Sequence, residues 1–212
     1  MNLFDRLHPH PNAADPQPIF CLKRDLPAPD ERHGLIALNW FLFGSIHLKT
    51  YFTRLDQALM LWGGLTAIIF GTVQVSRLTW FTQAASASIL TLGATLATVG
   101  LAWGWATVKQ ARWVIGVWAV LMVGAIALND YGVFTGNGLI LRHLCCGWLG
   151  LCGVGYWVTA MGMRSRALAG VGLVHWVAIP VIGAMPSWQF SLTGSTLTLS
   201  LWLLGTLQWD HR

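Results

Sequence analysis

The sequence predicts an all-α integral membrane protein, a bundle of about six transmembrane helices. Of its 212 residues, 55% are hydrophobic and only 10% are charged, whereas soluble domains carry about 25% charged residues. Apolar runs follow one another from residue 57 to residue 208, and a helix of about 20 such residues crosses ~30 Å of hydrocarbon. Basic residues lie singly between the apolar runs, where they can set the orientation of the helices in a membrane. They form no continuous basic surface that could bind nucleic acid.

Residues 1–33 are predicted to be a Pro-rich, disordered cytoplasmic tail. They contain six of the eight prolines and five of the eight acids, a composition that buries too little apolar surface to fold alone. The start of the chain lacks the apolar region of a cleavable signal peptide. We therefore expect the later helices to drive membrane insertion.

Residues 34–56 allow two interpretations. Their mostly apolar part, residues 35–48, includes Asn39 and His47 and runs directly into Lys49. A segment this short and this interrupted is typical of an amphipathic helix that lies along the membrane interface. A short seventh span is the alternative.

Six spans are predicted at residues 57–75, 78–108, 113–129, 139–163, 168–187 and 189–208. The second is about ten residues longer than a bilayer requires, so it must tilt or extend beyond the surface.

The distribution of Lys and Arg decides the number of spans. With six spans and both termini in the cytoplasm, eleven of the 13 basic residues lie on the cytoplasmic side, and only Arg77 and Arg142 lie on the far side. With seven spans, six basic residues would lie on one side of the membrane and seven on the other. The positive-inside rule therefore favours six spans in a bacterial inner or organellar membrane, with residues 209–212 as a cytoplasmic C-terminus.

One far-side connection gathers most of the polar candidates. Asp130, the only acid in residues 57–208, lies with Tyr131 where the third span ends, and Arg142 and His143 lie where the fourth begins. We predict that these four residues cluster at the membrane surface. The cluster is either an ion pair between Asp130 and Arg142 that closes the loop, or a small binding or proton-access site.

His175 is a second candidate, because polar side chains inside hydrocarbon are rare and often functional. It lies about 10 Å from the cytoplasmic end of the fifth span at ~1.5 Å per residue, with no acid within helical reach. We interpret it as a neutral histidine bonded to a neighbouring helix, with a ligand, proton-relay or substrate-contact role as the alternative.

No cofactor, metal or catalytic residue is predicted. His143 and Cys146 lie one helical turn apart, but a zinc site needs a third protein ligand that the sequence does not identify. The second span carries hydroxyls without an obvious base, and such hydroxyls usually bond back to carbonyls of the preceding turn. They are Ser86, Ser88, Thr91, Thr95 and Thr98.

Among possible functions, we favour a non-enzymatic accessory, assembly or structural membrane component. Gly100 and Gly104 form a G-x-x-x-G, a spacing that lets membrane helices approach closely. The alternatives are a small transporter or permease with a polar path near the far-side cluster and His175, and a membrane enzyme or cofactor-binding protein. The expected partners are bilayer lipids, other membrane helices or a second copy of the chain, and not nucleic acid.

Overall fold

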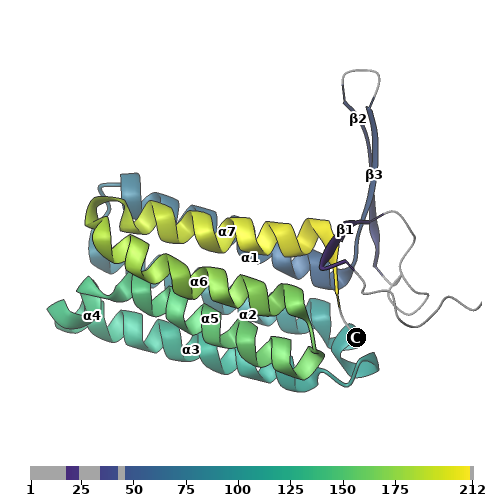
Figure 1. Cartoon of the computed structure of the whole chain (residues 1–212). Coiled ribbons are helices and arrows are strands. Elements are labelled where there is room, and N and C mark those ends of the chain that lie inside the picture. Colours follow the sequence, from purple (N-terminus) through teal and green to yellow (C-terminus); the bar gives the residue numbers. More distant parts are fainter. Residues whose placement is uncertain (1–17, 24–33, 43–45, 211–212) are drawn as a thin grey trace, which may run out of the picture.

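The computed structural model describes residues 18–23, 34–42 and 46–210, and its main body is an elongated bundle of helices (Figure 1). The helices are α1 Arg54–Val75, α2 Trp80–Val108, α3 Arg112–Thr135, α4 Gly138–Arg142, α5 Leu144–Met163, α6 Arg166–Ala184 and α7 Gln189–Thr206, with a 3-10 turn, η3, at Pro186–Trp188. The strands are β1 Phe20–Leu22, β2 Ile36–Leu42, β3 Ile46–Phe52 and β4 Leu207–Trp209.

Within these residues, five helices are long and apolar enough to cross a membrane: α1, α2, α3, α5 and α6. These five helices agree with the prediction of a helical protein that crosses the membrane several times. The sixth predicted span coincides with α7, which has 18 residues. Because seven of them are Ser or Thr, α7 is less apolar than the other five helices.

The prediction of an interfacial helix at residues 34–56 is wrong. β2 and β3 pair as an antiparallel hairpin, with Ile36 opposite Phe52 and Leu42 opposite Ile46, and the hairpin projects from one end of the bundle (Figure 1). The paired segments, IALNWFL and IHLKTYF, contain β-branched and aromatic residues that favour strands. A helix begins only at Arg54.

The start of α1 is held by a capping box. The Thr53 hydroxyl accepts the backbone N–H of Asp56 at 3.3 Å, and the Asp56 carboxylate accepts the backbone N–H of Thr53 at 2.7 Å. The same carboxylate lies 2.6 Å from Lys23 Nζ, which also donates to the carbonyl of Gly205 at 2.8 Å. Reciprocal capping satisfies two backbone donors that a helix start leaves free.

Part of the predicted disordered tail is therefore attached to the bundle. β1 pairs antiparallel with β4, with Phe20 opposite Trp209, and Lys23 reaches α1 and α7. Residues 1–17 and 24–33 lie outside the described residues. Strands β1 and β4 meet at the end of the bundle where α1 begins and α7 ends (Figure 1).

Five helices form a closed ring. α1 packs against α2, α2 against α3, α3 against α5, α5 against α7, and α7 against α1. α6 lies outside this ring, against α5 and α7. The arrangement leaves an interior between the five helices.

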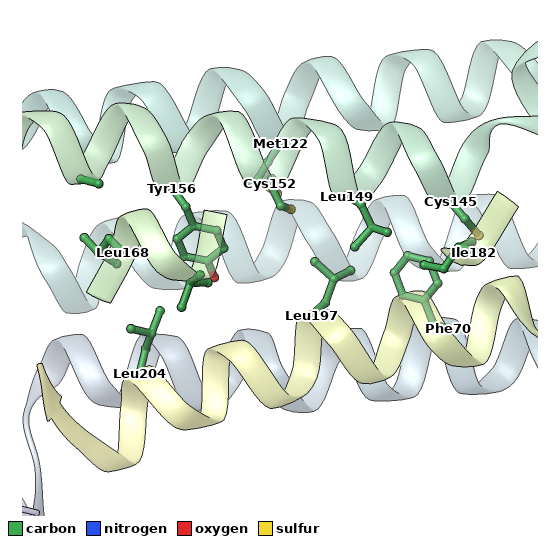
Figure 2. Packing of buried hydrophobic residues seen from close by; sticks show 12 residues of the cluster. Phe70, Met122, Cys145, Leu149, Cys152, Tyr156, Leu168, Ile182, Leu197 and Leu204 are labelled. Atoms are coloured by element: carbon green, nitrogen blue, oxygen red, sulfur yellow. The ribbon is translucent and has the colours of Figure 1, made fainter. Parts of the chain in front are cut away.

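The largest buried cluster lies where α5, α6 and α7 meet. Figure 2 shows side chains of α5 pointing toward α7; the labelled ones are Cys145, Leu149, Cys152 and Tyr156 on α5, and Leu197 and Leu204 on α7. Leu149 and Leu204 are fully buried. Outward-facing side chains such as Leu96 and Val120, each 72% exposed, are positioned to contact lipid.

Tryptophan rings pack directly over glycines at the helix contacts. A Cβ added to Gly63 of α1 would overlap the indole of Trp202 of α7. The same holds for the pairs Gly153 and Trp176, Gly155 and Trp118, and Gly162 and Trp113. Gly100 and Gly104 have nothing within 4 Å of an added Cβ, so the predicted G-x-x-x-G takes no part in packing within the described chain.

Candidate functional site

Asp130 lies inside a helix, although we predicted it at the edge of a loop. α3 continues to Thr135 and ends at Gly136, whose φ of 64° is left-handed. Both Asp130 oxygens accept the Ser88 hydroxyl at 2.9 Å, and one also accepts Asn129 Nδ2 at 3.0 Å. Asp130 thus links α3 to α2.

Tyr131 follows Asp130 on α3, whereas Arg142 and His143 lie at the end of α4. Tyr131, Arg142 and His143 are exposed, and the ion pairs formed among the described residues do not include one between Asp130 and Arg142. The predicted ion pair is therefore absent, because the neighbouring helix α2 supplies Ser88 as the partner of the carboxylate. Span topology alone could not determine the contacts of Asp130, because these depend on which helix packs beside α3.

His175 is fully buried on α6. Its Nδ1 lies 2.8 Å from the carbonyl oxygen of Val171, one turn earlier on the same helix. Because a carbonyl only accepts, Nδ1 carries the proton and Nε2 is an acceptor, which has no partner among the described residues. The ring lies beside Tyr156 of α5, with centroids 5.1 Å apart. His175 thus bonds within its own helix, whereas we expected a bond to a neighbouring one.

The interior of the five-helix ring contains a chamber of about 220 Å³. Residues that line it on α1 extend from Leu55 to Val73, a helical distance of about 27 Å at ~1.5 Å per residue. Six tryptophans line it together with many aliphatic side chains: Trp62, Trp80, Trp105, Trp118, Trp148 and Trp209. Sequence reasoning missed this chamber, since it depends on which face each helix turns inward.

Most polar groups in the chamber are already bonded to the protein. Trp62 Nε1 donates to the Thr98 hydroxyl at 2.8 Å, and Trp118 Nε1 donates to the Thr159 hydroxyl at 3.1 Å. Thr98 and Thr95 donate back to carbonyls of their own helix, as predicted. No Asp, Glu, Lys, Arg or His is among the described residues that line the chamber.

The hydroxyls of α2 were a sequence signal of this interior. Ser88, Thr91, Thr95 and Thr98 recur at helical spacing and all line the chamber, whereas Ser86 is exposed. A polar stripe on an otherwise apolar helix indicates the side that faces the protein interior. We had interpreted these residues as hydroxyls that lack a catalytic base and bond back to carbonyls of the preceding turn.

The described residues contain no group of three or more His, Cys, Asp or Glu side chains that could hold a metal ion. His143 is exposed and Cys146 is partly buried, and no third ligand joins them within the described part of the chain. Comparisons of the chain with family models, with curated proteins and with solved structures find no match.

Proposed function

We propose that the protein is a non-enzymatic membrane component that holds a long hydrocarbon chain, isoprenoid or acyl, inside the five-helix ring. The chamber carries this proposal, because it is elongated, lined mostly by apolar side chains and free of charged ones among the described residues. Its volume of about 220 Å³ exceeds the ~150 Å³ of an engineered apolar cavity that binds benzene.

A lipid chain is the occupant that the surroundings supply. The outer faces of the helices are apolar and the bilayer around them consists of hydrocarbon chains. A chain that fills the chamber restores the dispersion contacts that an empty space lacks. The accessory role predicted from the sequence thus takes a specific form, that of a lipid-binding membrane component.

A transporter with a polar path is supported less. Its path would have to connect the far-side cluster with His175, but His175 is not among the residues that line the chamber. Its Nδ1 is bonded to its own helix, and Asp130 is bonded to Ser88 and Asn129. An ion crossing this interior would meet apolar walls without a compensating charge.

The test is whether the protein retains a lipid when it is purified without added ligand. Organic extraction followed by mass spectrometry should find a molecule with a long hydrocarbon chain in near-equal amount to protein. Ala87 lines the chamber, and the exposed Ala85 on the same helix does not. Ala87→Phe should lose most of the bound molecule, whereas Ala85→Phe should keep it. Equal retention by the two folded variants, or a protein without lipid, would contradict the proposal.

We also propose six spans, with α7 as the sixth and both termini in the cytoplasm of a bacterial inner membrane. The 18 residues of α7 extend about 27 Å at ~1.5 Å per residue, close to the ~30 Å of hydrocarbon. Three of its hydroxyls find acceptors: Thr196 and Thr206 donate to their own helix, and Thr198 donates to the carbonyl of Gly63. The excess of Lys and Arg on one side supports the orientation.

Cysteine labelling tests this orientation in a variant that lacks the four native cysteines. Thr135 lies at the far-side end of α3, and Gln110 lies in the connection between α2 and α3 at the opposite end; both are exposed. An impermeant reagent added to intact cells should label Thr135→Cys and spare Gln110→Cys. The reverse pattern would show the opposite orientation.

A further inference from the structure

The β2–β3 hairpin has an apolar face that is exposed at Ile36 and Leu38. These two residues of β2 share a face, because successive residues of a strand point to opposite faces. Residues directly opposite each other in an antiparallel pair lie on the same face. Phe52 and Thr50, the partners of Ile36 and Leu38, therefore belong to it as well.

The strand pairing extends this apolar face to the far end of the hairpin. Positions 40 and 42 follow on the face of Ile36 and Leu38, and they pair with positions 48 and 46. The sequence has an apolar residue at each of these four positions: Trp40, Leu42, Ile46 and Leu48. The opposite face is mixed, and its positions hold Ala37, Asn39, Phe41, His47, Lys49 and Tyr51. The hairpin is therefore amphipathic.

The hairpin runs across the direction of the helices. Figure 1 shows its two strands extending sideways from the end of the bundle where α1 begins, and not along the line of α1 and α7. A single residue, Thr53, separates β3 from α1. Because a spanning helix runs from one membrane surface to the other, an element that crosses its direction at its end extends along the surface.

The base of the hairpin is fixed to the first turn of α1. Gln57 Nε2 donates to the carbonyl of Gly34, just before β2, at 2.8 Å and to the carbonyl of Phe52, at the end of β3, at 3.3 Å. Lys23 Nζ, which lies 2.6 Å from the Asp56 carboxylate, lies 5.5 Å from the centroid of the Phe52 ring. Contacts on both strands thus hold the hairpin in a defined direction relative to α1.

The depth of the hairpin matches the membrane interface. Thr53 precedes residue 57, where the first apolar run begins, by about 6 Å at ~1.5 Å per residue. Side chains reach about 5 Å from the mean plane of a sheet, half of the ~10 Å between packed sheets. An apolar face turned toward the bilayer therefore meets the boundary between head groups and acyl chains, where amphipathic elements bury ~5–10 Å deep.

A hairpin of two strands needs this environment. The unpaired N–H and C=O groups along its edges exclude it from the hydrocarbon interior, whereas the hydrated head groups can satisfy them. An isolated two-stranded hairpin is only marginally stable in water, so its apolar face needs a cover. Arg54, exposed beside β3, and Lys49 on the mixed face provide the positive charge that attracts anionic head groups.

We infer that the β2–β3 hairpin lies on the membrane surface, with the face of Ile36 and Leu38 against the acyl-chain boundary and the mixed face toward water. Its partner is the bilayer that surrounds the bundle. This surface is separate from the chamber, so the inference stands whether or not the chamber holds a lipid chain.

Two neighbouring positions provide a matched test, because Ala37 and Leu38 are both exposed and lie on opposite faces. In the variant without native cysteines, Leu38→Cys and Ala37→Cys are each labelled with the polarity-sensitive fluorophore NBD. The full-length protein is then reconstituted at a low ratio of protein to lipid in vesicles of phosphatidylcholine and phosphatidylglycerol. The label at position 38 should emit at shorter wavelength than the label at position 37.

A second set of vesicles contains lipids with a nitroxide quencher near the start of the acyl chain. The label at position 38 should lose most of its emission in these vesicles, whereas the label at position 37 should keep it. Ile36→Cys, on the same face as Leu38, should repeat the result and replaces Leu38→Cys if that variant does not fold.

Three results would overturn the inference. A label at position 38 that emits as in water and is not quenched would show that the apolar face does not contact the membrane. A blue-shifted label that lipid nitroxides do not quench would show that protein, such as a second copy of the chain, covers the face. Equal quenching at positions 37 and 38 would show that the hairpin has no preferred face toward the bilayer.

Discussion

Replacing Asp210 with alanine should destabilise the protein more than any single surface change near the C-terminus. Asp210 follows β4, is 3% exposed, and caps the start of α6 from outside that helix. Its carboxylate accepts the backbone N–H of Ala167 at 2.9 Å and of Arg166 at 3.1 Å. It also accepts the Ser165 hydroxyl at 3.0 Å and Arg166 Nε at 2.8 Å.

The magnitude follows from what each donor would lose. The Ala167 N–H is buried, and a buried unsatisfied donor costs about 1–3 kcal/mol. Removing a negative charge from a helix N-terminus costs about 0.3–1 kcal/mol. The half-exposed Arg166 guanidinium can be hydrated again, so its ion pair contributes no more than about 1 kcal/mol. We expect Asp210→Ala to lower the free energy of unfolding by about 2–4 kcal/mol, and Asp210→Asn, which keeps an acceptor, by about half as much.

Reversible unfolding in mixed detergent and SDS micelles, followed by circular dichroism, measures this difference. Gln208→Ala is the matched control, because Gln208 is exposed on the neighbouring strand β4 and should change stability by less than about 0.5 kcal/mol. Ser165→Ala should be intermediate, since its hydroxyl accepts the N–H of Leu168 at 3.3 Å as an N-cap. If Asp210→Ala unfolds at the same SDS fraction as Gln208→Ala, the proposed capping role is refuted.

Two further predictions follow from the same structure. Burial alone would raise the pKa of Asp210, but hydrogen bonds from the Arg166 guanidinium, the backbone N–H groups and the Ser165 hydroxyl outweigh it and lower the pKa below its usual value. A lowered pKa stabilises the fold above the unfolded value of about 3.9, so the advantage of wild type over Asp210→Asn should persist down to about pH 4 and shrink below it; a gap that widens in acid would contradict this. Gly63→Ala should destabilise by about 1–3 kcal/mol because the new methyl overlaps Trp202, whereas Gly64→Ala, with open space beside it, should be neutral or slightly stabilising. Similar unfolding of the two variants would show that Trp202 adapts without cost.

The helices were largely predictable from the sequence because a bilayer imposes length and composition on them. The predicted spans at 57–75 and 78–108 correspond to α1 Arg54–Val75 and α2 Trp80–Val108. The fourth predicted span failed in one respect: the chain breaks at His143 between α4 and α5, and Asn137 starts the short helix by accepting two backbone N–H groups. A break of this kind depends on local helix capping. It leaves the hydropathy of the segment unchanged, so hydropathy could not predict it.

The hairpin at β2 and β3 was not predictable from hydropathy. A short apolar run suits a buried helix or a strand equally well, and only pairing with a second segment decides between them. Ile36 to Leu42 finds that partner in Ile46 to Phe52. Amphipathic-helix reasoning considered the two segments as one continuous element.

The sequence by itself determined that this chain forms apolar helices of membrane length with few charged residues. Hydropathy and charge suffice for this, because both can be read from the residues before the chain folds. Tertiary structure decided which face of each helix turns inward, and thereby every feature of the candidate site. Asp130 bonds to Ser88 and not to Arg142 because α2 lies beside α3, and His175 lies outside the chamber because α6 packs on the outside of the ring. The chamber exists only because five helices close around it, since a cavity is a property of packing that no single helix contains.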